Sequence, residues 1–427
     1  MDAAGVPVTG PAAAGSVTAR ESADVVVVGS GIVGLGHALA ARQRGLSVIV
    51  LDRAAEIGGA SVRNFGHLCL TPQAGPARDF AVAARPLWLR LAADAGVWLR
   101  ESGTVVLARH ADEMRVLAGL AADRAGPSPF AAETHDAGHP LPEVQMLTAA
   151  EVEARTPVAP GSSVGGAFLP YDLQVNPRQA GIALRDHLSE RGVRFGYRTA
   201  VTAVRSGTVE TSRGRIDAGT VIVAVNHDID QLFPEVAERA GIRRCGLDML
   251  RVRAALRRPL AMPLLTGWSM LRYPAFSALP AAAALAERLH REHPELAALD
   301  LNQMYTQLPD GSLIVGDTHY RGTAVTPFQS EVAFETLLAL AAELFQVPRP
   351  AVLERWQGVY ASGPQDFLLE QPEPGVHLVA ATAGIGMTTG LGLAEHVIAG
   401  VVDDVPTTSA LPSLGTASPG TPTKGTP

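Results

Sequence analysis

Three glycines followed by an acidic residue carry the strongest chemical signal in this sequence of 427 residues. Gly29, Gly31 and Gly34 form a Gly-x-Gly-x-x-Gly pattern directly after the apolar run 25–28. The first glycine permits a tight turn, the second lets backbone approach a pyrophosphate, and the third allows a helix to pack closely on a strand. Asp52 ends a second apolar run, where a carboxylate can accept hydrogen bonds from a ribose. The pattern predicts a dinucleotide site rather than a fortuitous cluster of glycines.

Two further glycine-containing segments decide which dinucleotide is favoured, because the first loop does not separate FAD from NAD. Small residues at 58–61, which read Gly-Gly-Ala-Ser, would let the backbone pass beside a bulky cofactor. The segment 384–388, which reads Gly-Ile-Gly-Met-Thr, precedes an expected helix and offers N–H groups and a positive dipole end to a flavin oxygen or pyrophosphate. Each segment alone is also compatible with a plain glycine turn, but together with the first loop they favour FAD.

The elements around the first loop form a βαβ unit. We expect a buried strand over 25–28, a helix over 32–44 that Gly45 ends, and a second strand over 47–51. This order is typical of a parallel sheet with helices on its faces. The remaining expected elements are strands at 200–204, 220–225, 313–315 and 376–381, and a helix over 386–399.

The order of segments predicts an α/β fold, α+β overall, in which one domain is interleaved with another. We assign 22–78, 145–230 and 351–404 to a Rossmann-like nucleotide-binding domain. We assign 79–144 and 231–350, which mix Ala- and Leu-rich helices with longer strands, to a sheet-floored substrate-binding domain. The segments 1–21 and 405–427 are rich in Gly, Pro, Ser, Thr and Ala without periodicity, so we expect disordered tails there.

Composition excludes several classes of protein. Hydrophobic residues make up 47% and charged residues 18% of the chain, as in ordinary globular proteins. The net charge of −7 is spread without a basic stripe, so a nucleic-acid partner is not expected. The sequence has no long apolar run and no basic leader, which favours a cytoplasmic protein that does not cross a membrane. Cys69 and Cys245 have no metal-ligand spacing, so neither a metal site nor a disulfide is expected, and redox chemistry must come from a cofactor.

Taken together, the glycine segments resemble the superfamily of D-amino-acid oxidase, glycine oxidase and sarcosine oxidase. The resemblance implies that FAD lies extended between the two domains. It places the ADP half at Gly29, Gly31, Ile32, Val33, Gly34, Asp52 and Arg53, the adenine on Val201, the passing chain at Gly59, Ala60, Ser61 and Arg63, and the flavin end at Gly384, Ile385, Gly386, Met387 and Thr388.

Five longer strings are similar to one subgroup of these oxidases, which accompanies phosphonate-degrading enzymes in bacteria. They are GASVRNFGHL, LQVNPRQA, LRYPAF, DGSLIVGDTHY and RWQGVYASG, and they fall in both expected domains. This resemblance implies oxidation of a small aminophosphonate, such as 2-aminoethylphosphonate or its N-methylated form, by hydride transfer to flavin, giving an imine and then an aldehyde. A glycine, sarcosine or D-amino-acid oxidase or dehydrogenase remains an alternative, as does a flavin-binding protein without turnover.

Two departures from the wider family concern the segment 358–362. Sarcosine oxidases tether the flavin through a cysteine in the turn before the last strand, whereas this chain has Ser362 there and no cysteine nearby in sequence. The FAD is therefore expected to be non-covalent. Glycine and D-amino-acid oxidases carry an Arg-Pro in the same region that clamps the substrate carboxylate, and here Tyr360 stands instead.

The candidate catalytic residues are His67, Arg272, His319 and Tyr360. Arg272 follows an expected strand, and its guanidinium fork matches phosphonate oxygens, although an ordinary surface ion pair is the alternative. His67 and Arg63 would touch the ring or the substrate, although a packed core histidine is the commoner outcome. His319 and Tyr320 would line the same cavity. The expected partners are a small amine and an electron acceptor, with oxygen favoured, and the oligomeric state is open.

Overall fold

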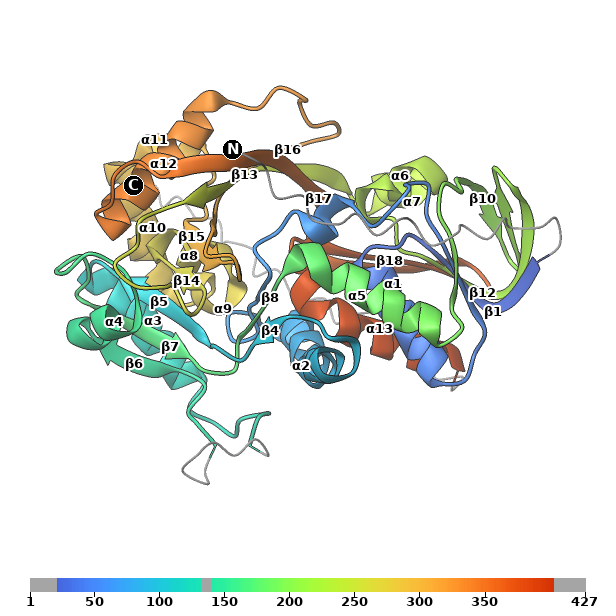
Figure 1. Cartoon of the computed structure of the whole chain (residues 1–427), viewed down its shortest axis with the longest axis horizontal. Helices are drawn as coiled ribbons and strands as arrows, with labels where there is room; N and C mark the ends of the chain where they lie inside the picture. Colours follow the sequence, from blue (N-terminus) through green and yellow to red (C-terminus); the bar gives the residue numbers. More distant parts are fainter. Residues whose placement is uncertain (1–20, 132–139, 403–427) are drawn as a thin grey trace, which may run out of the picture.

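The computed structural model describes residues 21–131 and 140–402. Two halves lie side by side along the longest axis of the molecule (Figure 1). The two predicted tails lie outside the described residues, except that Glu21 already begins the first strand, β1 (Glu21–Val28).

Within the described residues, fifteen strands form one sheet that runs through both halves. The strand order is β6-β7-β5-β14-β15-β16-β13-β17-β18-β12-β1-β2-β9, and β10 and β11 extend β12 as a hairpin. A separate sheet has the order β3-β8-β4. Its strands are β3 (His67–Leu68), β8 (Leu173–Val175) and β4 (Leu99–Arg100).

One half, called the parallel half here, contains five parallel strands. Its central strand β1 pairs with β12 on one side and β2 on the other. The apolar residues of these strands are buried on both faces of the sheet. Val25 and Val27 pack in a core with the long helices, and Val26 and Val28 pack in a core with the hairpin and two short helices. The other strands are β2 (Val48–Leu51), β9 (Arg194–Gly196), β12 (Gly214–Val223), β18 (Val376–Ala383), β10 (Val201–Arg205) and β11 (Thr208–Thr211).

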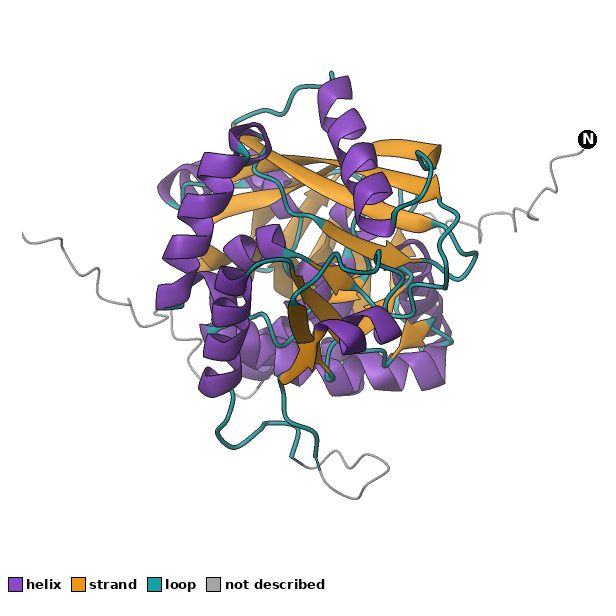
Figure 2. Cartoon of the chain, turned by 90° about the vertical axis from the view of Figure 1, so that its left-hand side faces the viewer, coloured by secondary structure: helices purple, strands orange, loops and turns teal. Residues whose placement is uncertain are grey.

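The other half, called the mixed half here, is mainly antiparallel. Figure 2 views the molecule from this side and shows helices wrapped around its strands. Its strands are β5 (Thr104–Ala108), β6 (Gln145–Thr148), β7 (Gly165–Leu169), β13 (Arg243–Arg253), β14 (Leu264–Leu265), β15 (Met304–Gln307), β16 (Leu313–Gly322) and β17 (Ala351–Glu373). The long strand β17 belongs to both halves, because its first part pairs with β13 and its last part with β18.

Helices bury an apolar face against each half. In the parallel half they are α1 (Ile32–Gln43), α2 (Gly75–Ala95), α5 (Pro177–Glu190) and α13 (Gly386–Val402), with α6 (Ile229–Leu232) and α7 (Pro234–Arg239) near the hairpin. In the mixed half they are α3 (Ala111–Asp123), α4 (Ala149–Arg155), α8 (Gly267–Arg272), α9 (Pro274–Ser277), α10 (Pro280–Glu292), α11 (Pro294–Ala298) and α12 (Glu331–Phe345). Two short 3-10 turns, η1 (Gly59–Val62) and η2 (Asn226–Asp228), complete the described elements.

The predicted α/β fold class is confirmed, and the strands and helices predicted by residue range are found close to the expected positions, whereas the strand expected just before Arg272 is a helix. Helix α1 ends at Gln43, and Gly45 follows with a positive φ of 82°, as a helix-ending glycine does. The domain division stays a prediction, and two placements bear on its boundaries. Helix α2 packs in one apolar core with α1 and α13 of the parallel half, and β7 pairs with β5 and β6 of the mixed half.

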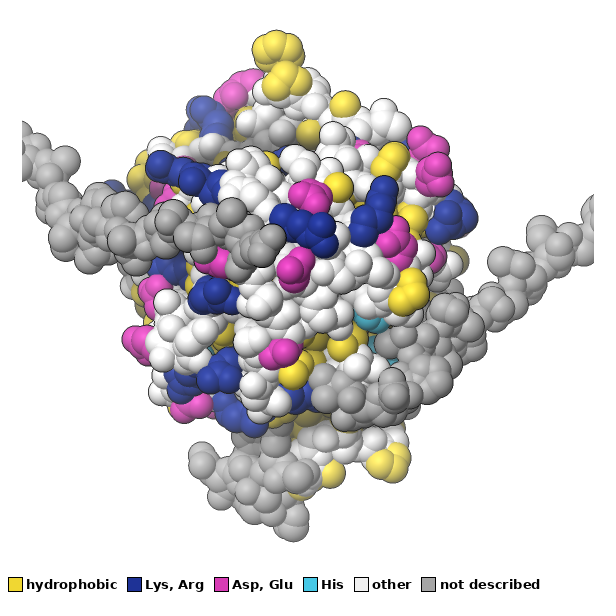
Figure 3. Space-filling model, turned by 90° about the vertical axis from the view of Figure 1, so that its right-hand side faces the viewer, with side chains coloured by type: hydrophobic (Ala, Val, Ile, Leu, Met, Phe, Trp, Pro, Cys, Tyr) yellow, Lys and Arg dark blue, Asp and Glu magenta, His cyan; other side chains and the backbone are white. Residues whose placement is uncertain are grey.

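Two further observations concern the described residues. None of their helices is long and apolar enough to cross a membrane, and no group of His, Cys, Asp or Glu among them is placed to hold a metal ion. On the face over the parallel half, Lys and Arg side chains alternate with Asp and Glu side chains rather than forming a stripe of one sign (Figure 3).

Candidate functional site

A cavity of about 630 Å³ lies where the two halves meet. This volume falls in the usual range for small-molecule and cofactor sites. Its wall begins at the glycine loop between β1 and α1, continues past η1 and the start of α13, and ends among residues of α8, β16 and β17. The cavity is therefore long, with one end in each half.

The glycine loop forms the first end of the cavity and has no room for side chains at two of its positions. Gly29 has a φ of +106°, and an added Cβ would lie 2.4 Å from the carbonyl oxygen of Ala224. A Cβ on Gly34 would lie 2.0 Å from the oxygen of Gly29, so helix and loop are in close backbone contact. Gly31 differs, because its Cβ would meet only the Ser61 hydroxyl, at 3.1 Å. The open side of Gly31 is the cavity itself.

Asp52 lies at the carboxyl end of β2 on the wall of this end, and its carboxylate is already engaged. Its Oδ2 accepts hydrogen bonds from the Ser30 backbone N–H at 2.8 Å and from the Ser30 hydroxyl at 2.7 Å. Its Oδ1 accepts from the Ala54 N–H at 2.9 Å. Oδ2 has both of its acceptor sites engaged, but Oδ1 has a further one, so the predicted ribose contact is compatible with these bonds.

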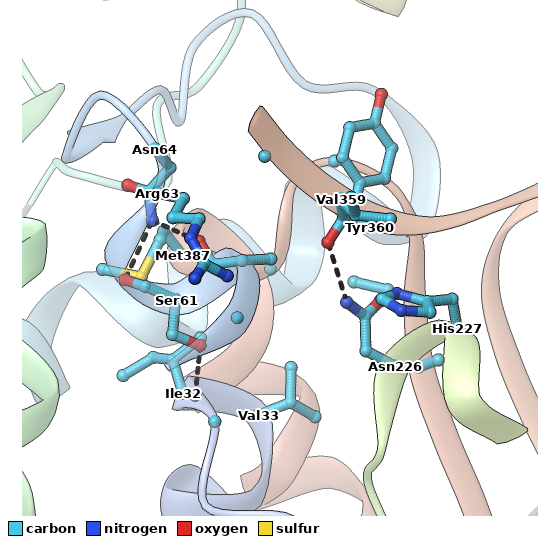
Figure 4. Close-up of a pocket in the computed structure, with 18 of the residues that line it drawn as sticks. Ile32, Val33, Ser61, Arg63, Asn64, Asn226, His227, Val359, Tyr360 and Met387 are labelled. Atoms are coloured by element: carbon cyan, nitrogen blue, oxygen red, sulfur yellow. Dashed lines mark hydrogen bonds between the residues drawn. The ribbon is translucent and has the colours of Figure 1, made fainter. Parts of the chain in front are cut away.

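The turn η1 closes over the start of α1. The Ser61 hydroxyl accepts a hydrogen bond from the Ile32 N–H at 2.9 Å, which satisfies one of the helix N-terminal donors (Figure 4). The Asn64 side chain donates to the Ala60 and Ser61 carbonyl oxygens and so holds the turn in shape. Small residues are needed here because this turn passes directly beside the cavity.

The first turn of α13 supplies the middle of the wall. Ile385, Met387 and Thr388 line the cavity, and the N–H groups of this turn have no earlier turn of the helix to bond to. The Thr388 hydroxyl accepts from the Cys69 N–H at 3.2 Å. Burial raises the pKa of Cys69 to about 11, so this cavity-lining thiol stays protonated and is a poor nucleophile.

The segment around Tyr360 is a strand rather than the turn that the sequence comparison suggested, since it lies inside β17. Cys245 on β13 is directly opposite Tyr360 in the strand pairing, so a cysteine that is distant in sequence lies close to this segment in space. The Asn226 side chain of η2 joins the same region by donating to the Val359 carbonyl oxygen and accepting from the Ala361 N–H (Figure 4).

Arg272 closes the far end of the cavity. The sequence predicts a strand directly before Arg272, but Arg272 is the last residue of helix α8, and a single residue, Thr266, separates α8 from the short strand β14. Its Nη2 donates to the Tyr360 hydroxyl at 2.5 Å, while Asp300 is 3.7 Å from its Nη1. Asp300 is closer to Arg321, at 2.5 Å, so the Arg272 guanidinium keeps donors that can bind another group.

Asp317 and His319 are residues of β16, and their side chains lie beside Arg272. The Asp317 Oδ1 accepts from the Asn302 side chain at 3.0 Å, and its Oδ2 is 3.3 Å from the His319 Nε2. Burial raises the pKa of Asp317 to about 7, although Arg272 and the Asn302 hydrogen bond lower it. Burial also lowers the pKa of His319 to about 3, and the positive charge of Arg272 acts in the same direction. At neutral pH His319 is uncharged.

His67 is buried on the cavity wall and also packs inward. Its Nε2 is 2.7 Å from the Thr104 hydroxyl and 3.4 Å from the Asp172 carboxylate. Tyr320 does not line the cavity, so that expectation is wrong. Alternation along β16 turns Tyr320 to the opposite face, where its hydroxyl contacts Asp248 and Gln357.

The structure brings almost every predicted site residue to one cavity. The four candidate catalytic residues line it, and so do all the predicted cofactor residues except Gly34, whose place is in the contact between helix and loop. Sequence reasoning missed Asn226, Asp317, Asn302 and Asp228, which pairs with Arg53 at 2.5 Å. Asp317 carried a usable signal, because it stands two positions before the candidate His319, just beyond the strand expected at 313–315. Asn302 had none.

Comparison with known proteins places the chain in a family. Residues 24–399 match the family described as DAO, FAD dependent oxidoreductase. This match covers most of the sequence, so the chain belongs to the DAO family and is an FAD-dependent oxidoreductase. The predicted cofactor, FAD, and the prediction of a flavin-dependent oxidoreductase are thereby confirmed. No protein of curated function matches the sequence.

Solved structures share the fold at low sequence identity. Glycine oxidase from Geobacillus kaustophilus is similar with a TM-score of 0.67 at 20% identity, over 90% of this chain and 95% of that chain. L-amino acid deaminase from Proteus vulgaris gives 0.71 at 16% identity, over 94% and 95%. L-alpha-glycerophosphate oxidase from Mycoplasma pneumoniae, solved with FAD bound, gives 0.68 at 17% identity, over 89% and 94%.

The residues of the cavity fit this cofactor. Gly31 lines the cavity without a side chain, and residues from the first turns of α1 and α13 line it too, so two helix N-termini lie at its wall, which suits the charged and polar parts of a flavin dinucleotide. FAD would supply the acceptor for the electron pair of the C–H bond that is oxidised. The protein's own residues must bind and orient the substrate.

Proposed function

We propose that the enzyme oxidises the C–N bond of a small amine that carries a phosphonate, such as 2-aminoethylphosphonate or its N-methylated form, to an imine that hydrolyses to an aldehyde. The observation that carries this proposal is the Arg272–Tyr360 pair at the far end of the cavity. The five sequence strings shared with the phosphonate-associated subgroup support the same substrate class.

The geometry of this pair supports an anion site. Because the Tyr360 oxygen accepts from Arg272, the phenol keeps its own proton for donation to a third group. Burial raises the pKa of Tyr360 above its ordinary value, which keeps that proton in place at neutral pH. A guanidinium and a phenol side by side can hold two oxygens of a tetrahedral anion with charge-assisted bonds.

An α-amino acid is the competing substrate class, and a specific observation favours it. Two of the fold neighbours are named glycine oxidase and L-amino acid deaminase, and a guanidinium binds a carboxylate as readily as a phosphonate. In an aminoethylphosphonate the anion stands one carbon further from the amine-bearing carbon. The length between the anion site and the flavin therefore distinguishes the two classes.

An anaerobic panel tests the proposal. The holoenzyme is mixed with 2-aminoethylphosphonate, its N-methyl form, glycine, sarcosine and D-alanine, and flavin bleaching is followed. We expect an aminophosphonate to bleach the flavin fastest. Faster bleaching by glycine or D-alanine than by every aminophosphonate would contradict the substrate, and no bleaching by any amine would favour a flavin-binding protein without turnover.

A further inference from the structure

The side chains of Asp317 and His319 on β16 both face the cavity and are close enough to share one proton. Asp317 and His319 are two positions apart on a strand, so they point to the same side. The Asp317 Oδ2 and the His319 Nε2 are 3.3 Å apart, and both side chains are almost fully buried. Both residues line the cavity beside Arg272.

The tautomer of His319 follows from its other nitrogen. Nδ1 lies 2.9 Å from the backbone carbonyl oxygen of Asp300, which can only accept, so Nδ1 carries a hydrogen. A neutral imidazole has one such hydrogen, so Nε2 presents a lone pair to the Asp317 carboxyl. Two acceptors at this distance attract each other only when a proton lies between them, and that proton belongs on Asp317 because His319 is held neutral.

The groups around this pair have mixed charge and set the pH at which Asp317 ionises. Arg272 favours its ionised form, and Asp300 disfavours it. Arg321 on the same strand also acts on His319 and binds Asp300. The pair has titratable or charged neighbours on every element packed against it. These elements are α8, α9, β13, β16, β17 and the segment before β15, and the neighbours are Arg272, Tyr273, Cys245, Arg321, Tyr360 and Asp300.

We propose that Asp317 is the base that takes the proton from the substrate ammonium, and that His319 positions that proton on Asp317. The inference rests on the proposed function, in which the substrate is an amine whose anion lies at Arg272. An alkyl amine arrives protonated, with a pKa of about 10, and its nitrogen has no free electron pair. In the proposed step an N–H bond breaks, its electron pair stays on nitrogen, and an O–H bond forms on Asp317.

The neutral amine that results has a nitrogen electron pair that can form the C=N bond, and FAD would supply the acceptor for the electron pair of the C–H bond. The proton on Asp317 is returned to solvent when the product leaves. Asn302 keeps its bond to the other carboxyl oxygen throughout, which fixes the orientation of the base. Asp317 is therefore a catalytic residue, and His319 is a positioning residue.

A pair of unreactive probes tests the step without turnover. In 2-amino-2-methylpropanesulfonate the amine-bearing carbon has no hydrogen, so it cannot be oxidised, and in 2,2-dimethylpropanesulfonate a methyl group replaces the amine. The sulfonate group of each probe keeps a single negative charge at all working pH values. Their dissociation constants from the holoenzyme are measured by calorimetry from acid to alkaline pH.

We expect opposite pH dependences for the two probes. The amine probe binds more tightly as pH rises through about 7, because Asp317 becomes able to take or pair with its charge. The amine-free anion binds more weakly over the same range, because Asp317 becomes negative. Asp317→Asn, which keeps the volume but cannot ionise, removes both dependences. Asp248→Asn is the matched control, since Asp248 is another buried carboxyl of this sheet that faces away from the cavity.

A kinetic measurement separates proton transfer from a simple ion pair. With the amine that bleaches the flavin fastest, the rate of bleaching in the wild type rises through about pH 7. In Asp317→Asn it rises only near the pKa of the amine itself, about 10. His319→Leu removes the group that accepts the hydrogen bond from protonated Asp317, so the midpoint of the pH dependence moves to lower pH than in the wild type. A merely structural role of His319 would not produce this shift.

The possible failures are distinguishable. If both probes bind but Asp317→Asn leaves their pH dependences intact, or if it keeps the wild-type kinetic midpoint, the inference is overturned while the anion site stands. If neither probe binds, the Arg272 anion site and the inference fall together. If glycine proves the best substrate but the probes show opposite dependences that Asp317→Asn removes, the inference stands and the aminophosphonate substrate falls.

Discussion

The two ends of the cavity are built on different principles. The end in the parallel half is made mainly from backbone, with Gly29 and Gly31 in one βαβ unit that also supplies the carboxylate of Asp52. The end in the mixed half is made from side chains, with Arg272 at the end of a helix, Asp317 on one strand and Tyr360 on another. Backbone geometry recurs wherever the same dinucleotide must be held, whereas side chains can be exchanged one at a time. We therefore expect substitutions at the first end to remove the cofactor and substitutions at the second to change only the substrate chemistry.

The largest expected effect is at Gly31. Gly31→Leu would fill the cavity beside the loop, and we expect complete loss of FAD retention, because the side chain would occupy the space of the pyrophosphate. The Cβ would lie 3.1 Å from the Ser61 hydroxyl, which must shift slightly, so the unfolding temperature of the apoprotein is measured alongside flavin content to separate loss of the cofactor from loss of the fold. Gly126→Leu, at an open loop position, is the control. Full flavin content of the Gly31 variant after gel filtration would show that the loop is misassigned.

The next effect, at Arg272, falls on the other end of the cavity. Arg272→Ala should lower kcat/KM roughly 30-fold to several-thousand-fold, because a buried charge-assisted contact to the anion is lost. This factor corresponds to about 2–5 kcal/mol of transition-state stabilisation. FAD content should not change. Arg349→Ala, which removes an exposed arginine, is the control. Wild-type steady-state kinetics in the Arg272 variant would place the anion elsewhere.

Asp52 should give a smaller effect that is confined to the cofactor. Asp52→Ala is expected to weaken FAD by about 1.5–3 kcal/mol, the range for hydrogen bonds to a charged group, without altering substrate preference. Part of this loss would come from Ser30, whose N–H and hydroxyl both depend on Asp52. Ser30→Ala measures that part separately. An unchanged flavin dissociation constant for Asp52→Ala would move the ribose contact to another residue.

The smallest effect is expected at the cysteines, although both lie near the site. Acid precipitation of the wild type should release all flavin as FAD, and Cys69→Ser and Cys245→Ser should release the same amount. The Cys69 thiol is buried with a raised pKa, which disfavours attack on the flavin. Flavin that stays with the precipitated wild type but not with one of these variants would identify that cysteine as a covalent link.

The same contrast explains how far the sequence could go. The backbone-built end was predictable because its residues are close in sequence and each has a geometric reason to be there, as the clash of a Cβ at Gly34 illustrates. At the other end, residue types were predicted but their arrangement was not. Placing Arg272 required knowing that helix α8 ends at the cavity, and turning Tyr320 away from it required the alternation of β16. The nearness of Cys245 to Tyr360 depended on strand pairing across more than a hundred residues, which local patterns do not specify.

Strand β17 runs without interruption from the floor of the mixed half into the parallel sheet, and Tyr360 lies near its middle. The length and register of this strand therefore set the position of Tyr360 relative to the two ends of the cavity. Removing one residue between Leu353 and Tyr360 would shift the register of the strand by one position. The side chains after the deletion would then turn to the opposite face of the sheet, and Tyr360 would leave the cavity unless the pairing with β18 were lost instead. Length variation among enzymes built this way should consequently be confined to the ends of this strand and to surface loops, while substrate range changes by substitution alone.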